Sequence, residues 1–351
     1  MTPKTFIGLA AVTLVTTIGA AVAVMNQPTT APVAYVDEPA FPELRAKPDA
    51  VMKVTIQTKD GTITLNRTSP ETWTSPDRFD YPAANDKINQ LVRQLNDMRL
   101  IEAKTASVER YERLEVEDMT EEAGSRLIRL EDAEGKVLAE ALIGKRLFRL
   151  TGNANSGTYI RRPGEDQSWL ASGGFDLEPE VEAWLDQIVV EIDREEVAAV
   201  EIALAEGEGY SVSREKAGDE LQFDALADGE ALKVDASIAE LASALTSVRL
   251  AAVKPKDDVA WPAERHVAEV RTFDGLELTV EMALIEDEPW AMFRAATGAL
   301  PSDADAADQT RQRAEAINDK TGLWAYQVNQ SLYQRLTKPR ESWVEASDGT
   351  S

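Results

Sequence analysis

The sequence predicts an α+β protein: an N-terminal transmembrane helix followed by two tandem related α+β units, each with antiparallel hairpins packed on helices. Three observations support this prediction. Residues 6–25 carry no charge, and apolar runs with a period of two flank turn dipeptides such as Asp60-Gly61. The order of strand and helix patterns that begins near residue 49 also recurs from residue 196.

The uncharged stretch is long enough to span a membrane. At about 1.5 Å per residue, residues 6–25 form a helix of about 30 Å, the thickness of a bilayer's hydrocarbon core. Lys4 precedes this stretch and the next charges, Asp37 and Glu38, are acidic, so the positive-inside rule places the rest of the chain outside the cytoplasm. The alternative is a signal peptide cleaved after Ala21-Val22-Ala23. Signal peptides have apolar regions of about 7–15 residues, and this longer one favours an uncleaved anchor.

A proline-rich stretch follows the predicted helix. Residues 26–48 contain five prolines, so we expect an extended tether between membrane and globule. The short apolar segment at residues 40–44 is expected to dock on the globule. The predicted division of the chain is an anchor at 1–25, a tether at 26–48, a first α+β unit at 49–195, a second at 196–345 and a disordered tail at 346–351.

The first unit is expected to alternate hairpins with helices. Apolar residues recur at helical spacing over residues 82–100, where Asn85 is expected to cap a helix. Apolar residues alternate on both sides of Asp60-Gly61, which predicts a hairpin. The other predicted elements are a strand at Trp73, a short helix at 107–114, a hairpin joining 127–130 to 137–143, paired strands at 158–160 and 168–170, and a helix at 177–188.

The second unit is predicted because similar motifs recur in the same order. Each match is weak, so the collinear order carries the argument for a tandem duplication. The alternative is one large sheet with chance similarities. The matched pairs are 197–202 with 51–56, 212–214 with 65–67, a helix at 238–250 with 82–100, the turn Asp274-Gly275 with Glu134-Gly135, and Leu323-Trp324 with Trp169-Leu170 ahead of a closing helix at 329–336.

An ordered set of motifs also carries a family resemblance. The set comprises Tyr81-Pro82 before a helix, residues 95–102 (LNDMRLIE), 159–162 (YIRR), 169–171 (WLA), 184–186 (WLD), 272–276 (TFDGL) and 323–326 (LWAY). It resembles the bacterial domain of unknown function 4340 family over nearly the whole chain. The resemblance implies an N-terminally anchored envelope protein, often encoded beside an ABC transporter of the gliding-motility type. The family has no assigned catalytic residues, so the resemblance transfers none.

Composition excludes several classes of function. The chain has 351 residues and a formal charge of −25. This charge argues against nucleic-acid binding, which needs a basic face, and against a basic patch on an anionic membrane. The absence of cysteine excludes thiolate metal sites, thiol catalysis and disulfides. A hydrophobic content of 43% is enough for sizeable cores.

The few residues with catalytic potential have simpler explanations. His266 is the sole histidine and precedes a predicted strand, so we interpret it as a surface residue at a strand edge. Asp303, Asp305 and Asp308 fail the EF-hand spacing, because Asp308 and Ala314 stand where glycine and glutamate are required. They are expected to cap a helix start or lie in a solvated loop.

The remaining charged and glycine-rich motifs are also predicted to be structural. The pairs Lys145-Arg146 and Arg161-Arg162 are expected to bond neighbouring carboxylates, and residues 286–289 are expected to form a solvated hairpin turn. Residues 152–157 lack the lysine of a P-loop. The seven tryptophans are expected to pack in the cores.

These observations predict a binding protein, with no catalytic, cofactor-binding or metal-binding residues assigned. We expect a single-pass protein of the bacterial inner membrane with its globular part in the periplasm. Its predicted role is a non-enzymatic accessory or assembly protein whose partner is an ABC transporter component. The alternatives are a solute- or glycan-binding module that uses a groove between the two units, and an envelope hydrolase that uses carboxylates.

Overall fold

The computed structural model describes residues 35–148, 156–174, 177–227, 229–233 and 237–346. The predicted anchor at 1–25, the first part of the predicted tether and residues 347–351 of the predicted tail at 346–351 lie outside the described residues, whereas Ala346 ends a strand. Within the described residues, no helix is both long enough and apolar enough to cross a membrane.

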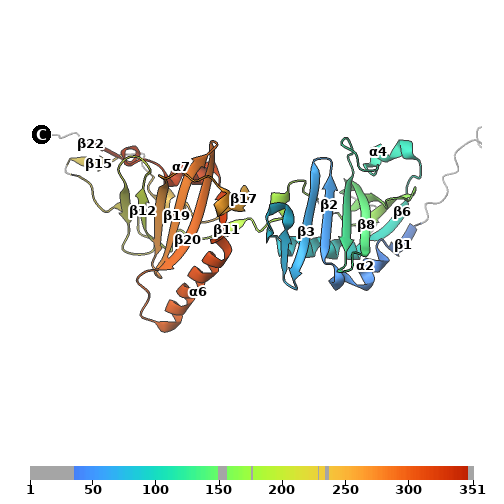
Figure 1. Ribbon diagram of the computed structural model, residues 1–351, viewed down its shortest axis with the longest axis horizontal. Helices are drawn as coiled ribbons and strands as arrows, with labels where there is room; N and C mark the ends of the chain where they lie inside the picture. Colours follow the sequence, from blue (N-terminus) through green and yellow to red (C-terminus); the bar gives the residue numbers. More distant parts are fainter. Residues whose placement is uncertain (1–34, 149–155, 175–176, 228, 234–236, 347–351) are drawn as a thin grey trace, which may run out of the picture.

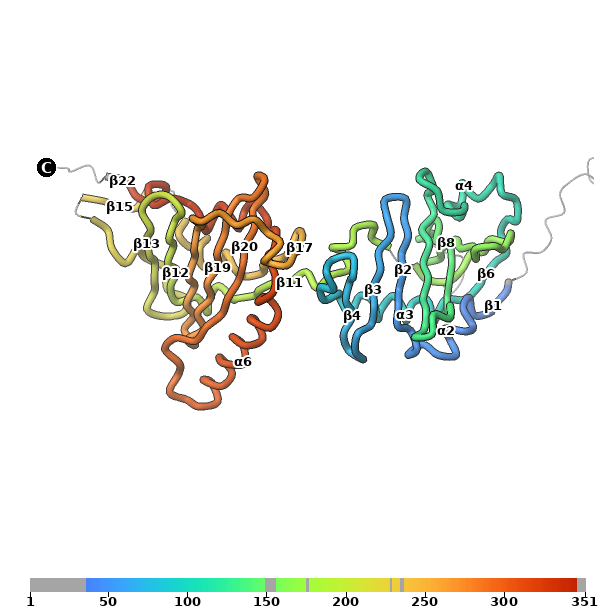
Figure 2. Tube along the Cα trace, viewed as in Figure 1, coloured from blue at the N-terminus to red at the C-terminus, as the bar shows by residue number. Residues whose placement is uncertain are grey.

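The described chain forms two lobes that meet at a narrow waist (Figure 1). The first lobe is built on a ten-stranded antiparallel sheet and the second on an eight-stranded antiparallel sheet. Each sheet packs on its own cluster of buried apolar side chains. Strands β1 (Tyr35–Pro39) and β22 (Val344–Ala346) lie at opposite outer ends of the molecule (Figure 2).

The first sheet joins hairpins edge to edge. The hairpin predicted at Asp60-Gly61 is confirmed, since β2 (Lys53–Thr58) and β3 (Gly61–Ser69) pair with Thr58 opposite Gly61. The hairpin formed by β7 (Arg126–Glu131) and β8 (Val137–Leu147) is confirmed as well. So is the pairing of β9 (Gly157–Arg161) with β10 (Ser168–Ser172). The strand order is β1, β6 (Arg99–Ala103), β10 (Ser168–Ser172), β9 (Gly157–Arg161), β8 (Val137–Leu147), β7 (Arg126–Glu131), β2 (Lys53–Thr58), β3 (Gly61–Ser69), β4 (Thr72–Ser75) and β5 (Tyr81–Pro82).

Helix α3 (Asn85–Asp97) covers the apolar face of this sheet. Its buried side chains are Ile88, Leu91, Val92 and Leu95, which match the predicted spacing. The predicted cap is wrong, because Asn85 is the first helical residue. Its side chain instead bridges two neighbouring backbones, accepting from the Trp73 N–H (2.9 Å) and donating to the Glu71 carbonyl (2.6 Å).

The segment at residues 35–48 belongs to the first lobe, although it was expected to be part of the tether. It forms β1, which pairs with β6, and helix α2 (Pro42–Ala46). Ala40, Phe41 and Leu44 are buried in the core, which confirms that this apolar segment docks. A 3₁₀ turn at Pro48–Ala50 leads into β2, and the predicted short helix at 107–114 is a 3₁₀ turn (Val108–Arg110) followed by α4 (Tyr111–Leu114).

The second sheet has a long three-stranded meander at its centre. Strand β18 (His266–Thr272) turns at Asp274-Gly275 into β19 (Leu276–Ile285), and β19 turns at Glu286-Asp287 into β20 (Glu288–Thr297), so both predicted turns are confirmed. The strand order is β14 (Gln222–Phe223), β13 (Tyr210–Ser213), β12 (Val197–Ala203), β18 (His266–Thr272), β19 (Leu276–Ile285), β20 (Glu288–Thr297), β21 (Trp324–Gln327) and β17 (Ala252–Pro255).

Two helices pack against this meander. Helix α6 (Ala304–Thr321) lies against β19 and β20, and α7 (Gln330–Leu336) lies against β20. Asn318 fixes α6 to the sheet edge, because its amide accepts from the N–H of Ala295 and donates to the carbonyl of the same residue, both at 2.8 Å. The predicted closing helix is confirmed, with Asn329 accepting from the Leu332 N–H at 2.7 Å as its cap.

The predicted fold class is wrong. Strand accounts for 39% of the structure and helix for 24%, and the hairpins are not separate units packed on helices. The physical reason is that an isolated hairpin leaves two edges of unpaired N–H and C=O groups. Strand β7 of one hairpin pairs with β2 of another, which satisfies both edges and builds a large antiparallel sheet.

Two other predicted helices, at residues 177–188 and 238–250, are largely replaced by other structure. Residues 177–188 contain only a 3₁₀ turn at Val181–Trp184, because the next residues extend and pair with the segment around Ala83. Of residues 238–250, only α5 (Ala239–Ala242) is α-helical. Val248 instead enters β16 (Val248–Arg249), which pairs with β11 (Ile188–Val190). A second small sheet joins β15 (Glu230–Leu232) to β22.

Candidate functional site

His266 lies at the start of β18, as predicted, but it is packed against other side chains and is less exposed than expected. Its ring is half-buried, and Nδ1 accepts a hydrogen bond from the Ala205 N–H at 3.3 Å. Tyr333 packs edge-on against it with ring centroids 5.7 Å apart. Burial lowers the pKa of His266, so the imidazole is neutral at pH 7. These contacts give His266 a packing role.

The acidic motifs serve turns and helix ends. Asp303 caps α6 by accepting from the Ala306 N–H at 2.9 Å, which confirms the predicted cap, and Asp308 pairs with Arg311 one turn later. Glu286 and Asp287 form the exposed turn between β19 and β20, as predicted. Among the described residues, His, Asp and Glu side chains do not gather in groups of three or more that could hold a metal ion.

The basic pairs bond neighbouring groups. Lys145 lies 3.4 Å from Glu115, and Arg162 lies 3.4 Å from Glu165. Arg161 is almost fully buried and pairs with Asp118. The prediction that these residues bond nearby carboxylates is confirmed for all three. Arg146, the fourth member, lies with its guanidinium carbon 5.1 Å from the Phe148 ring centroid.

The other sequence motifs contribute to packing or lie outside the described residues. The glycine-rich motif at 152–157 falls almost entirely outside them. Residues 173–174 follow β10 in a turn, with Gly173 at φ +86°. The tryptophans lie in the cores or at their margins: Trp73, Trp184, Trp290 and Trp343 are buried, and Trp169, Trp261 and Trp324 are half-buried.

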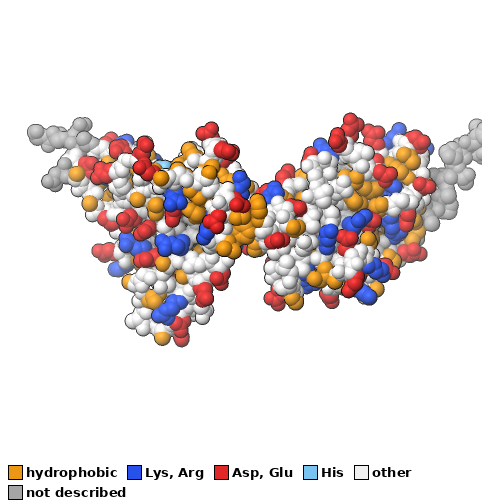
Figure 3. Space-filling view, in the orientation of Figure 1, with side chains coloured by type: hydrophobic (Ala, Val, Ile, Leu, Met, Phe, Trp, Pro, Cys, Tyr) orange, Lys and Arg blue, Asp and Glu red, His pale blue; other side chains and the backbone are white. Residues whose placement is uncertain are grey.

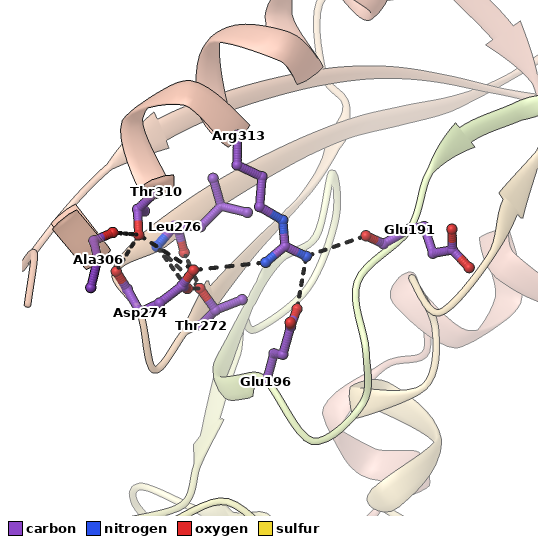
Figure 4. Close-up of polar contacts among 8 residues, drawn as sticks. All are labelled: Glu191, Glu196, Thr272, Asp274, Leu276, Ala306, Thr310 and Arg313. Atoms are coloured by element: carbon purple, nitrogen blue, oxygen red, sulfur yellow. Dashed lines mark hydrogen bonds and ion pairs between the residues drawn. The ribbon is translucent and has the colours of Figure 1, made fainter. Parts of the chain in front are cut away.

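A polar cluster around Arg313 docks α6 on the second lobe (Figure 4). Arg313 Nη2 lies 2.7 Å from the Glu196 carboxylate, and Nη1 lies 3.7 Å from Asp274 in the β18–β19 turn. The buried Thr310 hydroxyl donates to the Asp274 carbonyl at 3.0 Å. Because the Arg313 guanidinium lies beside both carboxylates and these contacts tie α6 to the β18–β19 turn, the role of the cluster is structural.

The waist between the lobes is organised around Tyr81. This residue belongs to the edge strand β5 of the first sheet, yet its side chain is fully buried in the core of the second lobe. Its ring lies edge-on to Trp324 (5.1 Å between centroids) and Tyr326 (6.1 Å). Apolar side chains gather visibly at the waist (Figure 3). The space predicted as a groove between units is thus filled at this point.

Backbone pairing reinforces the contact made by Tyr81. Ala83 bridges to Leu185, and the N–H of Asp186 donates to the Pro82 carbonyl at 3.0 Å. The Tyr81 hydroxyl donates to the Asp186 carbonyl at 3.2 Å, while the Asp186 carboxylate pairs with Lys320 at 2.7 Å. Trp184 belongs to the first core and Leu185 to the second, so the chain passes from one core to the other between adjacent residues.

Two cavities on the first lobe share Arg93 of α3 in their walls. We call them together the α3 groove. One has a volume of about 460 Å³ and the other about 390 Å³, within the range typical of small-ligand sites. The first is bounded by Gln90, Gln94 and Asp97 of α3 and by Ser172 to Gly174, and the second by Asn89 and Asn96 of α3, Pro48, Asp49, Arg67 and Trp73.

Sequence reasoning identified neither the waist nor the α3 groove. Tyr81-Pro82 was noted only as part of a family motif, since its partner Trp324 lies far away in the chain. The polar side chains of α3 match the solvated face of any amphipathic helix. The cavities are concave because residues 48–49 help to form the wall of one and residues 172–174 the wall of the other, beside α3.

Comparison with known families identifies the class of protein. The model of one family, Domain of unknown function (DUF4340), matches residues 73–264. This is more than half of the 351 residues, so the chain belongs to that family, and the resemblance seen in the sequence is confirmed over these residues. No curated protein and no solved structure matches the chain.

Proposed function

We propose that this protein is a membrane-anchored accessory or assembly protein without catalytic activity, and that its partner is an ABC-type transport system. In this proposal residues 6–25 cross the bacterial inner membrane once, and the two lobes lie in the periplasm or its extracytoplasmic equivalent. The uncharged character of residues 6–25 and the membership of the domain of unknown function 4340 family support the proposal.

The single observation that carries the proposal is the position of β1. This strand lies at the end of the first lobe that is farthest from the second lobe (Figure 1). Only residues 26–34 separate it from the proposed anchor, a length that spans at most about 30 Å. The first lobe is therefore held close to the membrane, and the second lobe stands beyond it.

The waist makes this arrangement useful for assembly. A side chain of the first sheet is buried in the second core, and strand-like backbone pairing runs beside it. Such a contact favours one relative orientation of the lobes over free rotation. We propose that the first lobe contacts the transporter near the membrane while the second presents its surface farther out.

The carboxylates favour a binding role over the hydrolase alternative. The acidic residues considered from the sequence cap α6, pair with arginine or lie in an exposed turn. A glycosidase would instead need two carboxylates facing one substrate across a cleft.

Co-purification tests the proposal. The full chain is extracted from native membranes in mild detergent, captured by a C-terminal tag and analysed by mass spectrometry. We expect the membrane-spanning and ATP-binding subunits of an ABC transporter to be enriched. Replacing Leu14 by Arg in the apolar stretch is expected to release the chain from alkaline-washed membranes and to remove the enrichment, because a charged residue in a spanning helix costs about 2.5–3.5 kcal/mol.

The matched control is Leu14→Ala, which keeps the stretch uncharged and is expected to behave like the original chain. Recovery of the original chain with no transporter subunits above the Leu14→Arg background would refute the partner assignment. Recovery in the soluble fraction would refute the anchor.

A further inference from the structure

The polar side chains that line the α3 groove lack protein partners. The side chains of Asn89, Gln90, Arg93 and Gln94 make no hydrogen bond or ion pair with any other described residue. Asn96 donates to Asp97 at 2.9 Å, which leaves its carbonyl oxygen buried with no donor among the described residues. A buried acceptor without a donor costs about 1–3 kcal/mol, so a ligand that supplies a donor here gains that free energy.

The charges that line the groove cancel. Arg67 and Arg93 contribute two positive charges, and Asp49 and Asp97 contribute two negative ones. This is a neutral region on a chain whose formal charge is −25. An anionic ligand would be repelled by the overall field, and the groove offers no net negative charge to attract a cation.

Amide side chains suit a ligand rich in hydroxyl groups. Each asparagine or glutamine both donates and accepts, and so does each hydroxyl group of a sugar. Pro48 and Val92 in the wall of the second cavity give the C–H face of a sugar ring an apolar surface to pack against. Arg93, shared by the two cavities, is placed to bond hydroxyls of adjacent sugar units.

From this combination we propose that the α3 groove binds a neutral saccharide of two or three units. Arg93 bonds the ligand where the cavities meet, and the Asn96 carbonyl accepts a hydrogen bond from a ligand hydroxyl. This proposal does not depend on the proposed contact between the first lobe and a transporter. Saccharide recognition would give the lobe nearest the proposed anchor a contact with envelope glycan.

Saturation-transfer NMR tests this proposal on the full chain. The chain is kept in a zwitterionic detergent without a sugar headgroup, because a maltoside detergent would compete. The probes are maltotriose, cellotriose and the trimer of N-acetylglucosamine. We expect saturation transfer to at least one of them. Replacing Arg93 by Ala is expected to weaken binding at least tenfold, and replacing Asn96 by Ala is expected to have a similar effect.

The matched control is Gln312→Ala, an exposed amide on α6 of the other lobe, which is expected to change binding by less than twofold. Arg93 is exposed, so its variant should melt at the same temperature as the original chain and remains decisive if Asn96→Ala is destabilised. Absence of binding to all three probes would overturn the proposal. Equal binding by the original chain and Arg93→Ala, or an equal loss in Gln312→Ala, would overturn it too.

Discussion

Tyr81 and Trp324 belong to different sheets, yet their rings meet edge-on with centroids 5.1 Å apart. Tyr81 is fully buried, and every ring that it contacts belongs to the second lobe. The two lobes therefore share one packed side chain in addition to their backbone connection. The stability of the second core and the orientation of the lobes both depend on this residue.

Replacing Tyr81 by Ala should uncouple the lobes. We expect a loss of about 3–5 kcal/mol in the unfolding free energy of the second lobe, as for other large buried aromatics. Urea unfolding should then show two transitions, and small-angle X-ray scattering should show a larger maximum dimension.

The matched variant is Tyr81→Phe, which keeps the ring and removes the hydroxyl, with its hydrogen bonds to the Asp186 carbonyl and to the Tyr326 hydroxyl. This variant should lose about 1 kcal/mol of unfolding free energy, and its scattering curve should match that of the original chain. If Tyr81→Ala gave the same scattering curve as Tyr81→Phe, the waist would not depend on this side chain.

Buried tyrosines should make the second lobe sensitive to alkali. Burial raises the pKa of Tyr210 to about 12 and also raises the pKa of Tyr81 and Tyr326. In the unfolded chain these phenols ionise near pH 10. Their contribution to stability is therefore complete below pH 10 and is lost progressively as the pH rises toward the folded-state pKa values.

Urea titrations between pH 8 and pH 12 measure this effect. In Tyr210→Phe the hydroxyl that accepts from the Trp343 indole N–H is missing, so this variant should be less stable than the original chain at pH 8. The difference in unfolding free energy between the two proteins should narrow above pH 10. The original chain then loses stability because Tyr210 ionises when it unfolds, whereas phenylalanine does not ionise. A constant difference up to pH 12 would rule out the assigned role of Tyr210.

The two glycine turns matched by sequence should respond differently to alanine. Gly135 (φ +79°) and Gly275 (φ +84°) both occupy the left-handed region, which costs an alanine about 1–2 kcal/mol. A methyl group at Gly135 meets no atom within 4 Å, whereas one at Gly275 would lie 2.4 Å from the Ala299 carbonyl oxygen. Gly275→Ala should therefore cost about 1–3 kcal/mol more than Gly135→Ala in thermal unfolding. Equal losses of stability in the two variants would mean that the backbone near Ala299 moves aside without an energetic penalty.

The β19–β20 turn should be open to stabilisation. Glu286 (φ 55°) and Asp287 (φ 66°) both lie in the left-handed region, where a two-residue hairpin turn prefers Asn-Gly. The double change Glu286→Asn with Asp287→Gly should raise the unfolding free energy by about 1 kcal/mol. The measurement is the urea midpoint of the second lobe, with Asp287→Ala as the control that keeps the strain. A double variant no more stable than this control would contradict the argument.

The hairpins were predictable because their signals are local. Asp60-Gly61 and Asp274-Gly275 lie between alternating apolar residues, and a turn needs no information from elsewhere in the chain. The joining of hairpins into large sheets was not predictable, because it depends on pairs such as Val54 with Leu130. Such long-range pairs leave no mark on the spacing of either strand.

The helix predictions failed where apolar spacing had another cause. Val181, Trp184, Leu185 and Ile188 recur at helical intervals, but Trp184 fills one core and Leu185 the other. Only the start of helix α6 was predicted, because the helix buries small side chains such as Ala307, Thr310 and Ala314, which lack the signal of large apolar residues. For the α3 groove, the sequence shows the polar residues of the helix but not the loops that make their surroundings concave.

The waist also determines how the molecule would respond to being pulled. Strands β1 and β22 lie at its two outer ends, so tension along the chain passes through the contact between β5 and residues 185–186. Few hydrogen bonds cross that contact, whereas each large sheet is held by many. Under load the lobes should part at Tyr81 while both sheets stay folded, so that the protein extends in one discrete step before any strand unravels.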